Sequence, residues 1–423
     1  MSTIKSIYAY EILDSKGIPT IEARLTLDND LYVTTSVPGA SINTVKEAVD
    51  LRDGDPNRFG SMGVLHAVSY VNELIAPKIK GASINKQIEI DKWLIQADGT
   101  KNKSRLGVNT ILIISQLLAK ANAYTSHIPI YKYINQLYHA LYKDEIPLEK
   151  IPTAIFNTIN GGIHANNTID FQEFQIIPSS SFSFATSYQK AVEIFHELKK
   201  VLEYRNATTA VGEEGGFSPN LTTNLDALEI LTETITQKKM KCGLDIFLGI
   251  DLAASRFYHN NQYSIKDKSQ PLKKAEYITF LESVIKNYAI LSLEDPFAED
   301  DWESWKKLTS KVSSNIYMIG DESIRMNKDR LAFALRENAL TTFVIKPNQI
   351  GTITEILELV NIVRRSNTSY IVASRSSETN DDFIADLAVG IQSEFVKFGA
   401  PIRGERVSKY NRLWKIERDE LGK

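Results

Sequence analysis

The stretch Thr342-Phe-Val-Ile-Lys346 decides the fold, because a short apolar run ends there on a charged side chain. Five more runs of this kind occur in the second half of the chain: Ile246–Ile250, Ile290–Leu293, Tyr317–Ile319, Tyr370–Val372 and Phe395–Val396. Short runs rich in β-branched and aromatic residues are typical of strands. The charged residues that follow them within three positions are Asp251, Glu294, Asp321, Arg375 and Lys397.

Helical patterns separate several of these runs. One set of apolar residues falls on a single helix face: Ile353, Ile356, Leu357, Val360 and Val363. A second set does the same: Phe383, Ile384, Leu387, Ala388 and Ile391. Alternating strands and helices predict parallel strands with crossover helices. In a barrel of such units the carboxyl ends of all strands open onto one face. The sequence therefore predicts that three carboxylates, two lysines and an arginine converge there.

The first part of the chain has a different pattern. Three strands are expected at Ile4–Leu13, Thr20–Leu27 and Leu31–Val37, and amphipathic helices around Val64–Leu74, Ile88–Leu94 and Asn109–Ala123. The 423 residues leave room for a barrel of roughly 250 residues and one smaller domain. The predicted fold class is α/β: a C-terminal (β/α)8 TIM-like barrel at 139–423, preceded by a smaller N-terminal α+β domain at 1–138. The charged segment 141–152 is the expected linker.

Composition sets limits on location and partners. The formal net charge is −3 and the sequence pI is about 6.2, so no general attraction to nucleic acid or anionic membrane is expected. Cys242 is the only cysteine, which excludes an intramolecular disulfide and favours a reduced, cytoplasmic setting. The first residues lack an apolar segment of signal-peptide length, and the most apolar stretch, 111–123, is too short for a membrane span.

The three expected carboxylates predict a metal site. Asp251, Glu294 and Asp321 form an all-oxygen set, and Mg²⁺ prefers such ligands. The alternative is that some of them form ion pairs with the nearby lysines. A carboxylic acid bound beside such a cation loses its α-proton more easily, because the cation and the lysines stabilise the extra negative charge.

A lysine in this setting is a candidate base. Neighbouring cations and partial burial are expected to lower the pKa of Lys346, which lies between Ile345 and Pro347. The alternative is that Lys346 only pairs with a metal-binding carboxylate. Lys397 either shares the role of base or, as its position favours, acts as a second cation beside the substrate.

Three further segments offer groups for the same chemistry. The glycine-rich turn Val211–Phe217 carries Glu213 and Glu214, one of which, Glu214 by preference, can protonate a leaving hydroxyl. The loop Asn160–Ala165 carries His164 and is followed by Gln172 and Glu173, although a lone loop histidine is more often structural. Arg375 and Ser376 together suit a phosphate group, unless Arg375 pairs with Glu378 or Asp381 instead.

Eight segments together resemble enolase (phosphopyruvate hydratase). They lie in the family's order over nearly the whole chain: Glu11–Gly17, Leu51–Asp55, Asn160–His164, Gln172–Phe174, Val211–Phe217, Ser292–Pro296, Lys346–Gly351 and Gly399–Asn411. The resemblance implies a barrel whose first strands depart from simple βα order. It also implies a Mg²⁺-dependent hydro-lyase that interconverts 2-phospho-D-glycerate and phosphoenolpyruvate in glycolysis and gluconeogenesis.

The resemblance also assigns roles to residues. Asp251, Glu294 and Asp321 bind the first Mg²⁺, Lys346 removes the C2 proton and Glu214 protonates the C3 hydroxyl. Glu173 and His164 support the acid, while Gln172, Arg375, Ser376 and Lys397 hold the substrate. Enolases are commonly homodimers or larger homo-oligomers. Many bacterial members are cytoplasmic and also found at the cell surface, where binding to host proteins is implied.

Two segments depart from the family pattern. The usual Pro-Ser-Gly-Ala-Ser-Thr-Gly lid, whose second serine ligates a second Mg²⁺ and contacts substrate, reads Pro38-Gly-Ala-Ser-Ile-Asn-Thr44. Either Ser41 keeps that role, which we favour, or Ile42 occupies the position. Ser374 stands where a histidine is usual, so one cationic group near the substrate is missing. This leaves two alternatives open: a paralogue for another phosphoenolpyruvate-like or phosphonate substrate, and a non-catalytic surface-binding protein.

Overall fold

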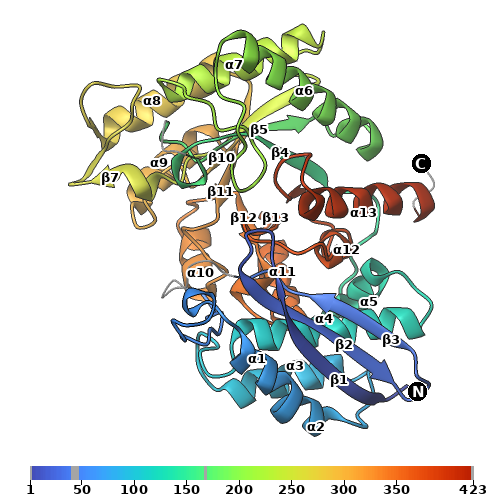
Figure 1. Ribbon diagram of the computed structural model, residues 1–423. Helices are drawn as coiled ribbons and strands as arrows, with labels where there is room; N and C mark the ends of the chain where they lie inside the picture. Colours follow the sequence, from blue (N-terminus) through green and yellow to red (C-terminus); the bar gives the residue numbers. More distant parts are fainter. Residues whose placement is uncertain (1, 40–46, 166–168, 421–423) are drawn as a thin grey trace.

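The N-terminal part is a three-stranded meander covered by helices. The computed structural model describes residues 2–39, 47–165 and 169–420. The strands β1 (Ile4–Leu13), β2 (Pro19–Leu27) and β3 (Tyr32–Ser36) pair antiparallel in the order β1-β2-β3. Alternate residues of β2 from Ile21 to Leu27 are fully buried, as expected for a sheet with one covered face. Figure 1 shows the helices of this part lying against the sheet.

Those helices include one long buried element. They are η1 (Phe59–Ser61), α1 (Leu65–Ser69), the π-helical turn η2 (Tyr70–Ile75), α2 (Ala76–Ile79), α3 (Gln87–Asp98), α4 (Val108–Thr125) and α5 (Ile130–Tyr142). Helix α4 is buried on nearly every side. It touches β2, β3 and α5, and it also touches η5 (Pro347–Gln349) and α11 (Ile353–Arg365) of the second part. An all-round apolar helix of this kind belongs in a core. The predicted boundary at residue 138 lies within α5.

The second part is a closed eight-stranded barrel. Its strands are β4 (Thr153–Asn160), β5 (Glu173–Pro178), β6 (Ile246–Asp251), β10 (Ile290–Glu294), β11 (Tyr317–Gly320), β12 (Thr342–Ile345), β13 (Ser369–Ala373) and β14 (Phe395–Lys397). The main helices are α6 (Phe184–Tyr204), α7 (Asn224–Gln237), α8 (Lys274–Asn287), α9 (Trp302–Val312), α10 (Lys328–Arg336), α11 (Ile353–Arg365), α12 (Phe383–Gly390) and α13 (Gly404–Glu420). The predicted α/β class with a TIM-like barrel is confirmed.

Short elements complete the barrel. They are the turns η3 (Gly162–His164), η4 (Ala254–Phe257) and η5 (Pro347–Gln349), and the small sheet β7 (Tyr258–His259), β8 (Gln262–Tyr263) and β9 (Leu272–Lys273).

The barrel is not eight identical βα units. Strand β5 runs antiparallel to both β4 and β6, whereas the remaining neighbours are parallel. Among its described residues the connection after β4 carries the short turn η3 rather than a crossover helix, and it returns the chain antiparallel. Helices α6 and α7 then follow before β6, as Figure 1 shows. The apolar runs predicted six strands and missed β4 and β5, because Asn157, Thr158 and Asn160 interrupt the pattern in β4.

Strand register brings the charged residues to one level. Glu294 lies opposite Asp251 in the β10–β6 pair, and Asp251 lies opposite Glu173 in the β5–β6 pair. Lys397 pairs with Ala373 at the end of β13. Because β5 is reversed, Glu173 at its beginning lies at the same barrel end as the carboxyl ends of the other strands. All of these side chains therefore open onto the face where barrel enzymes carry their sites.

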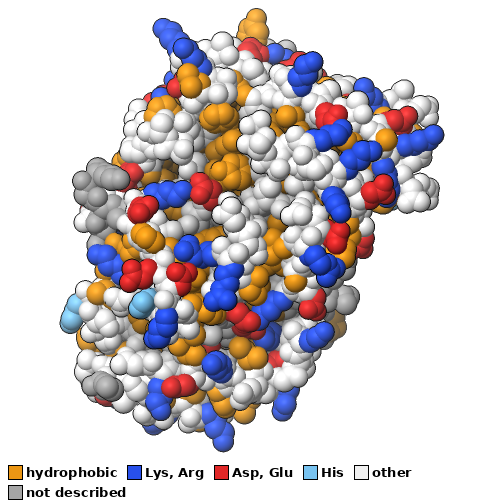
Figure 2. All heavy atoms as spheres, turned by 180° about the vertical axis from the view of Figure 1, so that it is seen from behind, with side chains coloured by type: hydrophobic (Ala, Val, Ile, Leu, Met, Phe, Trp, Pro, Cys, Tyr) orange, Lys and Arg blue, Asp and Glu red, His pale blue; other side chains and the backbone are white. Residues whose placement is uncertain are grey.

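Polar contacts fix the N-terminal part over this barrel. Asp381, before α12, pairs with Lys120 of α4 at 2.6 Å and accepts a hydrogen bond from Thr35 at 2.8 Å. A second link joins Lys103 to Glu355 of α11 at 2.8 Å. On the face seen in Figure 2, positive and negative side chains are interspersed. Among the described residues, no helix combines the length and apolar character that crossing a membrane requires.

Candidate active site

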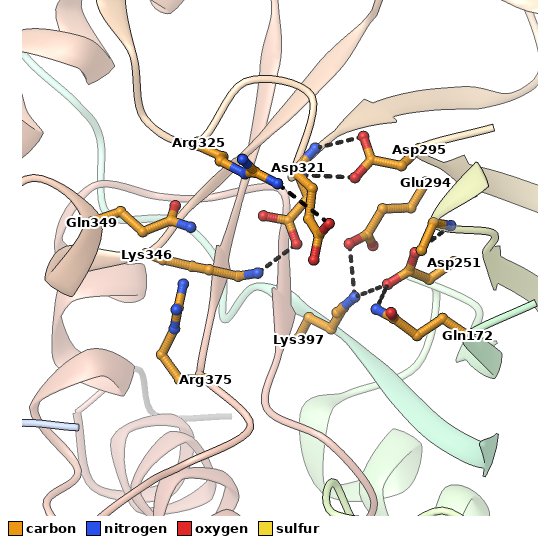
Figure 3. Close-up of polar contacts among 12 residues, drawn as sticks. Gln172, Asp251, Glu294, Asp295, Asp321, Arg325, Lys346, Gln349, Arg375 and Lys397 are labelled. Carbon is orange, nitrogen blue, oxygen red and sulfur yellow. Dashed lines mark hydrogen bonds and ion pairs between the residues drawn. The ribbon is translucent and has the colours of Figure 1, made fainter. Parts of the chain in front are cut away.

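The six charged residues that end the predicted strands gather at one cavity of about 600 Å³. Five of them line it, and Glu294 lies beside them through its contact with Lys397 (Figure 3). Residues from the other predicted segments join the wall: Gln172, Glu173, Glu214, Ser374 and Ser376. The convergence that the strand–helix rhythm predicted is therefore present, although the individual roles stay predictions.

Lys397 is the centre of an acidic cluster. Its ammonium lies 2.8 Å from Glu294, 3.2 Å from Asp251 and 3.3 Å from Glu173. The lysine and these three carboxylates are almost fully buried. Burial alone lowers the pKa of Lys397, but the surrounding carboxylates outweigh it and hold that pKa well above its usual range. The surroundings thus favour the charged form of Lys397, and its role beside the substrate stays a prediction.

The carboxylates respond to burial and to the cation that each one faces. Burial and neighbouring acids raise the pKa of Asp251, and they raise that of Glu294 well above its usual range. Burial also acts on Asp321, but the ammonium groups of Lys346 and Lys397 outweigh it and lower its pKa to about 2. Asp321 is therefore the member of the three whose charged form the surroundings favour most.

The expectation of a lowered pKa for Lys346 is wrong for this state of the protein. Burial does lower the pKa of Lys346, yet the contact with the Asp321 carboxylate outweighs burial and the net direction is upward. The ion pairs named as alternatives are present: Lys346 pairs with Asp321, and Lys397 with Asp251 and Glu294. Lys346 can serve as a base only when Asp321 pairs with another cation in place of the lysine ammonium.

The donor set fits a hard cation in its chemistry. Two buried carboxylate oxygens, Glu294 Oε2 and Asp321 Oδ1, have no hydrogen-bond partner among the described residues. The cavity wall carries seven carboxylates against five lysine or arginine side chains, so it favours added positive charge before an anion enters. The side chains are not arranged as a finished site, because no three acids, histidines or cysteines of the described residues could enclose one ion as they stand.

The glycine-rich turn separates its two glutamates. Glu214 is 7% exposed and lines the cavity, whereas Glu213 pairs with Lys16 of the N-terminal part and is more exposed. The alternative left open by the sequence thus favours Glu214. Gly215 in this turn has φ +88°, and a Cβ there meets Ala400 at 3.0 Å, so a glycine suits the position.

Gln172 and Glu173 lie beside the acidic cluster. The Gln172 amide donates a hydrogen bond to Asp251 at 3.2 Å, and its buried Oε1 has no partner among the described residues. Glu173 accepts a hydrogen bond from Gln175 at 2.7 Å.

The Arg375 loop is held from behind by a buried arginine. Arg406 is fully buried and donates hydrogen bonds to the Ser374 hydroxyl at 3.0 Å and to the carbonyls of Arg375 and Ser376. The Arg375 guanidinium points toward Lys346 (Figure 3) and pairs with Glu47 at 3.4 Å. Within the described ranges it makes no ion pair with Glu378 or Asp381, the alternatives considered; Glu378 instead accepts from the Arg375 backbone N–H at 3.0 Å.

The remaining predicted residues have a limited description. Ser41 and Ile42 lie outside the described residues, so their positions stay a prediction. His164 belongs to the backbone of turn η3.

Two acidic residues were not predicted from the sequence: Glu47 in the cavity wall, and Asp295 next to Glu294 in the chain. Glu47 accepts a hydrogen bond from Gln349 at 2.9 Å and pairs with Arg375, which brings the N-terminal part into the cavity wall. Asp295, next to Glu294, is buried, and burial with nearby acids raises its pKa to about 7. Gln349, the partner of Glu47, could have been found from the sequence because it lies three residues after Lys346. Glu47 itself could not, because no apolar strand precedes it.

Family comparison agrees with this architecture. Residues 149–423 match the family described as the enolase C-terminal TIM barrel domain. Residues 4–134 match the enolase N-terminal domain. These matches cover both structural parts in the order found in the fold. The chain belongs to the enolase family.

Proposed function

We propose that this protein is a Mg²⁺-dependent hydro-lyase that interconverts 2-phospho-D-glycerate and phosphoenolpyruvate. The observation that carries the proposal is that one cavity is lined by Lys346, Glu214 and Arg375 together with the buried carboxylates. Membership of the enolase family supports a lyase with this pair of proton-transfer groups. Sites that place an acid and a base at one cavity can remove a proton and assist a leaving group in the same turnover.

The cofactor proposal rests on the oxygen donors. Asp251, Glu294 and Asp321 would hold Mg²⁺, and the buried, unpartnered oxygens of Glu294 and Asp321 support this. When bound, the ion stabilises the negative charge that a substrate carboxylate gains as its α-proton leaves.

The chain's own residues supply the proton transfers. Lys346 removes the α-proton once its ammonium has lost a proton, which requires Asp321 to release its hold on the lysine. Glu214 donates a proton to the departing C3 hydroxyl from its place in the cavity wall.

The other residues bind and stabilise. Lys397 remains charged and offsets the negative charge of the substrate. Arg375 and Ser376 receive the phosphate, because a planar guanidinium can donate two parallel hydrogen bonds to such a group. Gln172 presents an amide beside Asp251. Glu173 and His164 are proposed to support the acid, and Ser41 to contact substrate and a second Mg²⁺.

Location and assembly are further proposals. The lone, half-buried Cys242 suits a reducing cytoplasm. A homodimer or larger homo-oligomer, and presence at the cell surface with binding to host proteins, follow from the resemblance alone.

A second candidate substrate class is favoured by Ser374. Its hydroxyl lies in the cavity wall but is engaged by Arg406, so the wall presents a small side chain instead of an imidazole. A phosphonate or another phosphoenolpyruvate-like acid is the corresponding candidate.

A substrate panel tests both candidates. Purified protein is assayed with 2-phosphoglycerate and with phosphonate analogues, each with and without Mg²⁺. We expect Mg²⁺-dependent product from 2-phosphoglycerate with the largest kcat/KM. A larger kcat/KM for an analogue favours the paralogue, and no turnover of any member supports a binding protein.

A further inference from the structure

Asp295 has an unusual set of partners for a buried acid. It is 4% exposed and directly follows Glu294. One carboxylate oxygen accepts the backbone N–H groups of Asp321 at 3.2 Å and Ser323 at 3.3 Å. The other accepts the N–H of Glu322 at 2.7 Å. One side chain thus binds three successive amides of the turn that carries Asp321.

The backbone of Asp295 extends the connection to a third strand. Its N–H donates to the carbonyl of Ile319 in β11 at 2.9 Å, and its carbonyl accepts from Ala254, after β6, at 3.1 Å. Asp295 therefore links the ends of β6, β10 and β11. These are the strands that carry Asp251, Glu294 and Asp321.

The backbone conformation of Asp295 indicates that the surroundings impose this arrangement. Its φ of 41° lies in the left-handed region, which is unfavourable for a non-glycine residue. Such conformations persist where neighbouring contacts determine them, and they cluster at functional sites. Within residues 2–39, 47–165 and 169–420, Asp295 has no lysine, arginine or histidine at ion-pair distance. Its side chain accepts hydrogen bonds from the three amides instead.

We propose that Asp295 is a positioning residue of this site, which fixes the backbone of the turn that carries Asp321 beside the strand ends that carry Asp251 and Glu294, the three carboxylates proposed to hold one divalent cation. The inference deepens the proposed function and rests on it. The side chain of Asp295 touches no substrate; it acts through the backbone of the β11 turn. Partners of metal-binding groups typically change metal affinity or activity by about 10–100-fold when they are removed.

The first test needs no variant. Hydrogen exchange of the unaltered protein is measured for the amides of Asp321, Glu322 and Ser323. We expect all three to exchange as slowly as barrel-strand amides, because each is bound to a buried acceptor. Exchange as fast as in exposed loops overturns the proposal, whether or not any variant folds.

The second test compares Asp295→Asn with a matched acid. Asp98, at the end of α3, is also buried and accepts three backbone N–H groups, from Thr100, Arg105 and Leu106, far from the cavity. Both D295N and D98N should lower the melting temperature. Only D295N should weaken Mg²⁺ binding in calorimetry, by about 10–100-fold, and lower kcat.

The outcomes separate the two proposals. If D295N loses stability like D98N but keeps Mg²⁺ affinity and kcat, Asp295 has only a structural role. If D295N weakens Mg²⁺ binding while the unaltered protein fails to turn over 2-phosphoglycerate, Asp295 stands as a positioning residue and the proposed reaction falls. If the unaltered protein binds no Mg²⁺, the metal role of Asp295 is refuted with it.

Discussion

Replacing Lys397 by methionine removes the cation from the centre of the acidic cluster. The structure places its ammonium within 2.8–3.3 Å of Glu294, Asp251 and Glu173, all of them buried. Removing one partner of a buried ion pair typically costs about 3–5 kcal/mol, because the remaining charge is left without compensation. Because burial already raises the pKa values of Asp251 and Glu294, these acids can take up protons when the lysine is lost, so we expect K397M to lose up to about 3–5 kcal/mol of unfolding free energy at pH 7.5 without divalent cations.

Magnesium should reduce this loss. A divalent cation among the same carboxylates replaces the missing positive charge, so adding MgCl₂ should stabilise K397M more than the unaltered protein. The assay is urea unfolding followed by fluorescence, with and without MgCl₂ at constant ionic strength. The reasoning is refuted if K397M matches the unaltered protein without Mg²⁺, or if Mg²⁺ leaves the gap unchanged.

Lys103→Met provides the matched control. Lys103 is also buried and pairs with one carboxylate, Glu355, at 2.8 Å, but neither residue lines the cavity. K103M should lose stability without being selectively stabilised by Mg²⁺. A rescue of K103M equal to that of K397M would show that the ion acts nonspecifically.

Two further predictions concern the acid and a buried carboxyl group. Glu214→Gln should lower the rate of dehydration by about 10²–10⁴-fold, while Lys346 still exchanges the C2 proton of 2-phosphoglycerate with solvent deuterium. Glu213→Gln, at the exposed neighbour, should keep both activities. Loss of both activities in E213Q contradicts the assignment of Glu214 as the acid. Burial raises the pKa of Asp91 from 3.8 to about 6 against the hydrogen bonds that it accepts from Thr354. The folded state thus holds a proton that the unfolded state releases, so the unfolding free energy should fall by about 2 kcal/mol between pH 4 and pH 7 relative to Asp91→Asn. A parallel pH dependence of the two proteins in denaturant titrations argues against this.

Strand-ending charges could be predicted because the barrel repeats one local rule. Each run of apolar residues fills the barrel wall, and the residue after it reaches the open end, so Asp251, Glu294 and Lys397 were placed by pattern alone. The same rule failed for β4 and β5, because polar residues in β4 hide its period and the reversed β5 puts its cavity-lining residue, Glu173, at its start.

The electrostatics of the site could not be predicted from spacing. The pKa of Lys346 depends on the distance to Asp321, and that distance is set by the β11–β12 packing rather than by neighbours in sequence. Glu47 and Asp295 were missed for a related reason. Glu47 belongs to another domain, and Asp295 acts through backbone amides 26 to 28 residues away in the chain.

The most direct test of the account is solvent exchange at C2. 2-Phosphoglycerate is incubated with Mg²⁺ in deuterium oxide, and loss of the C2 proton is followed by NMR for the unaltered protein and for Lys346→Ala. We predict exchange and turnover by the unaltered protein. For K346A we predict that both rates fall by at least about 10²-fold. Exchange by K346A at the unaltered rate contradicts the central claim that Lys346 is the base.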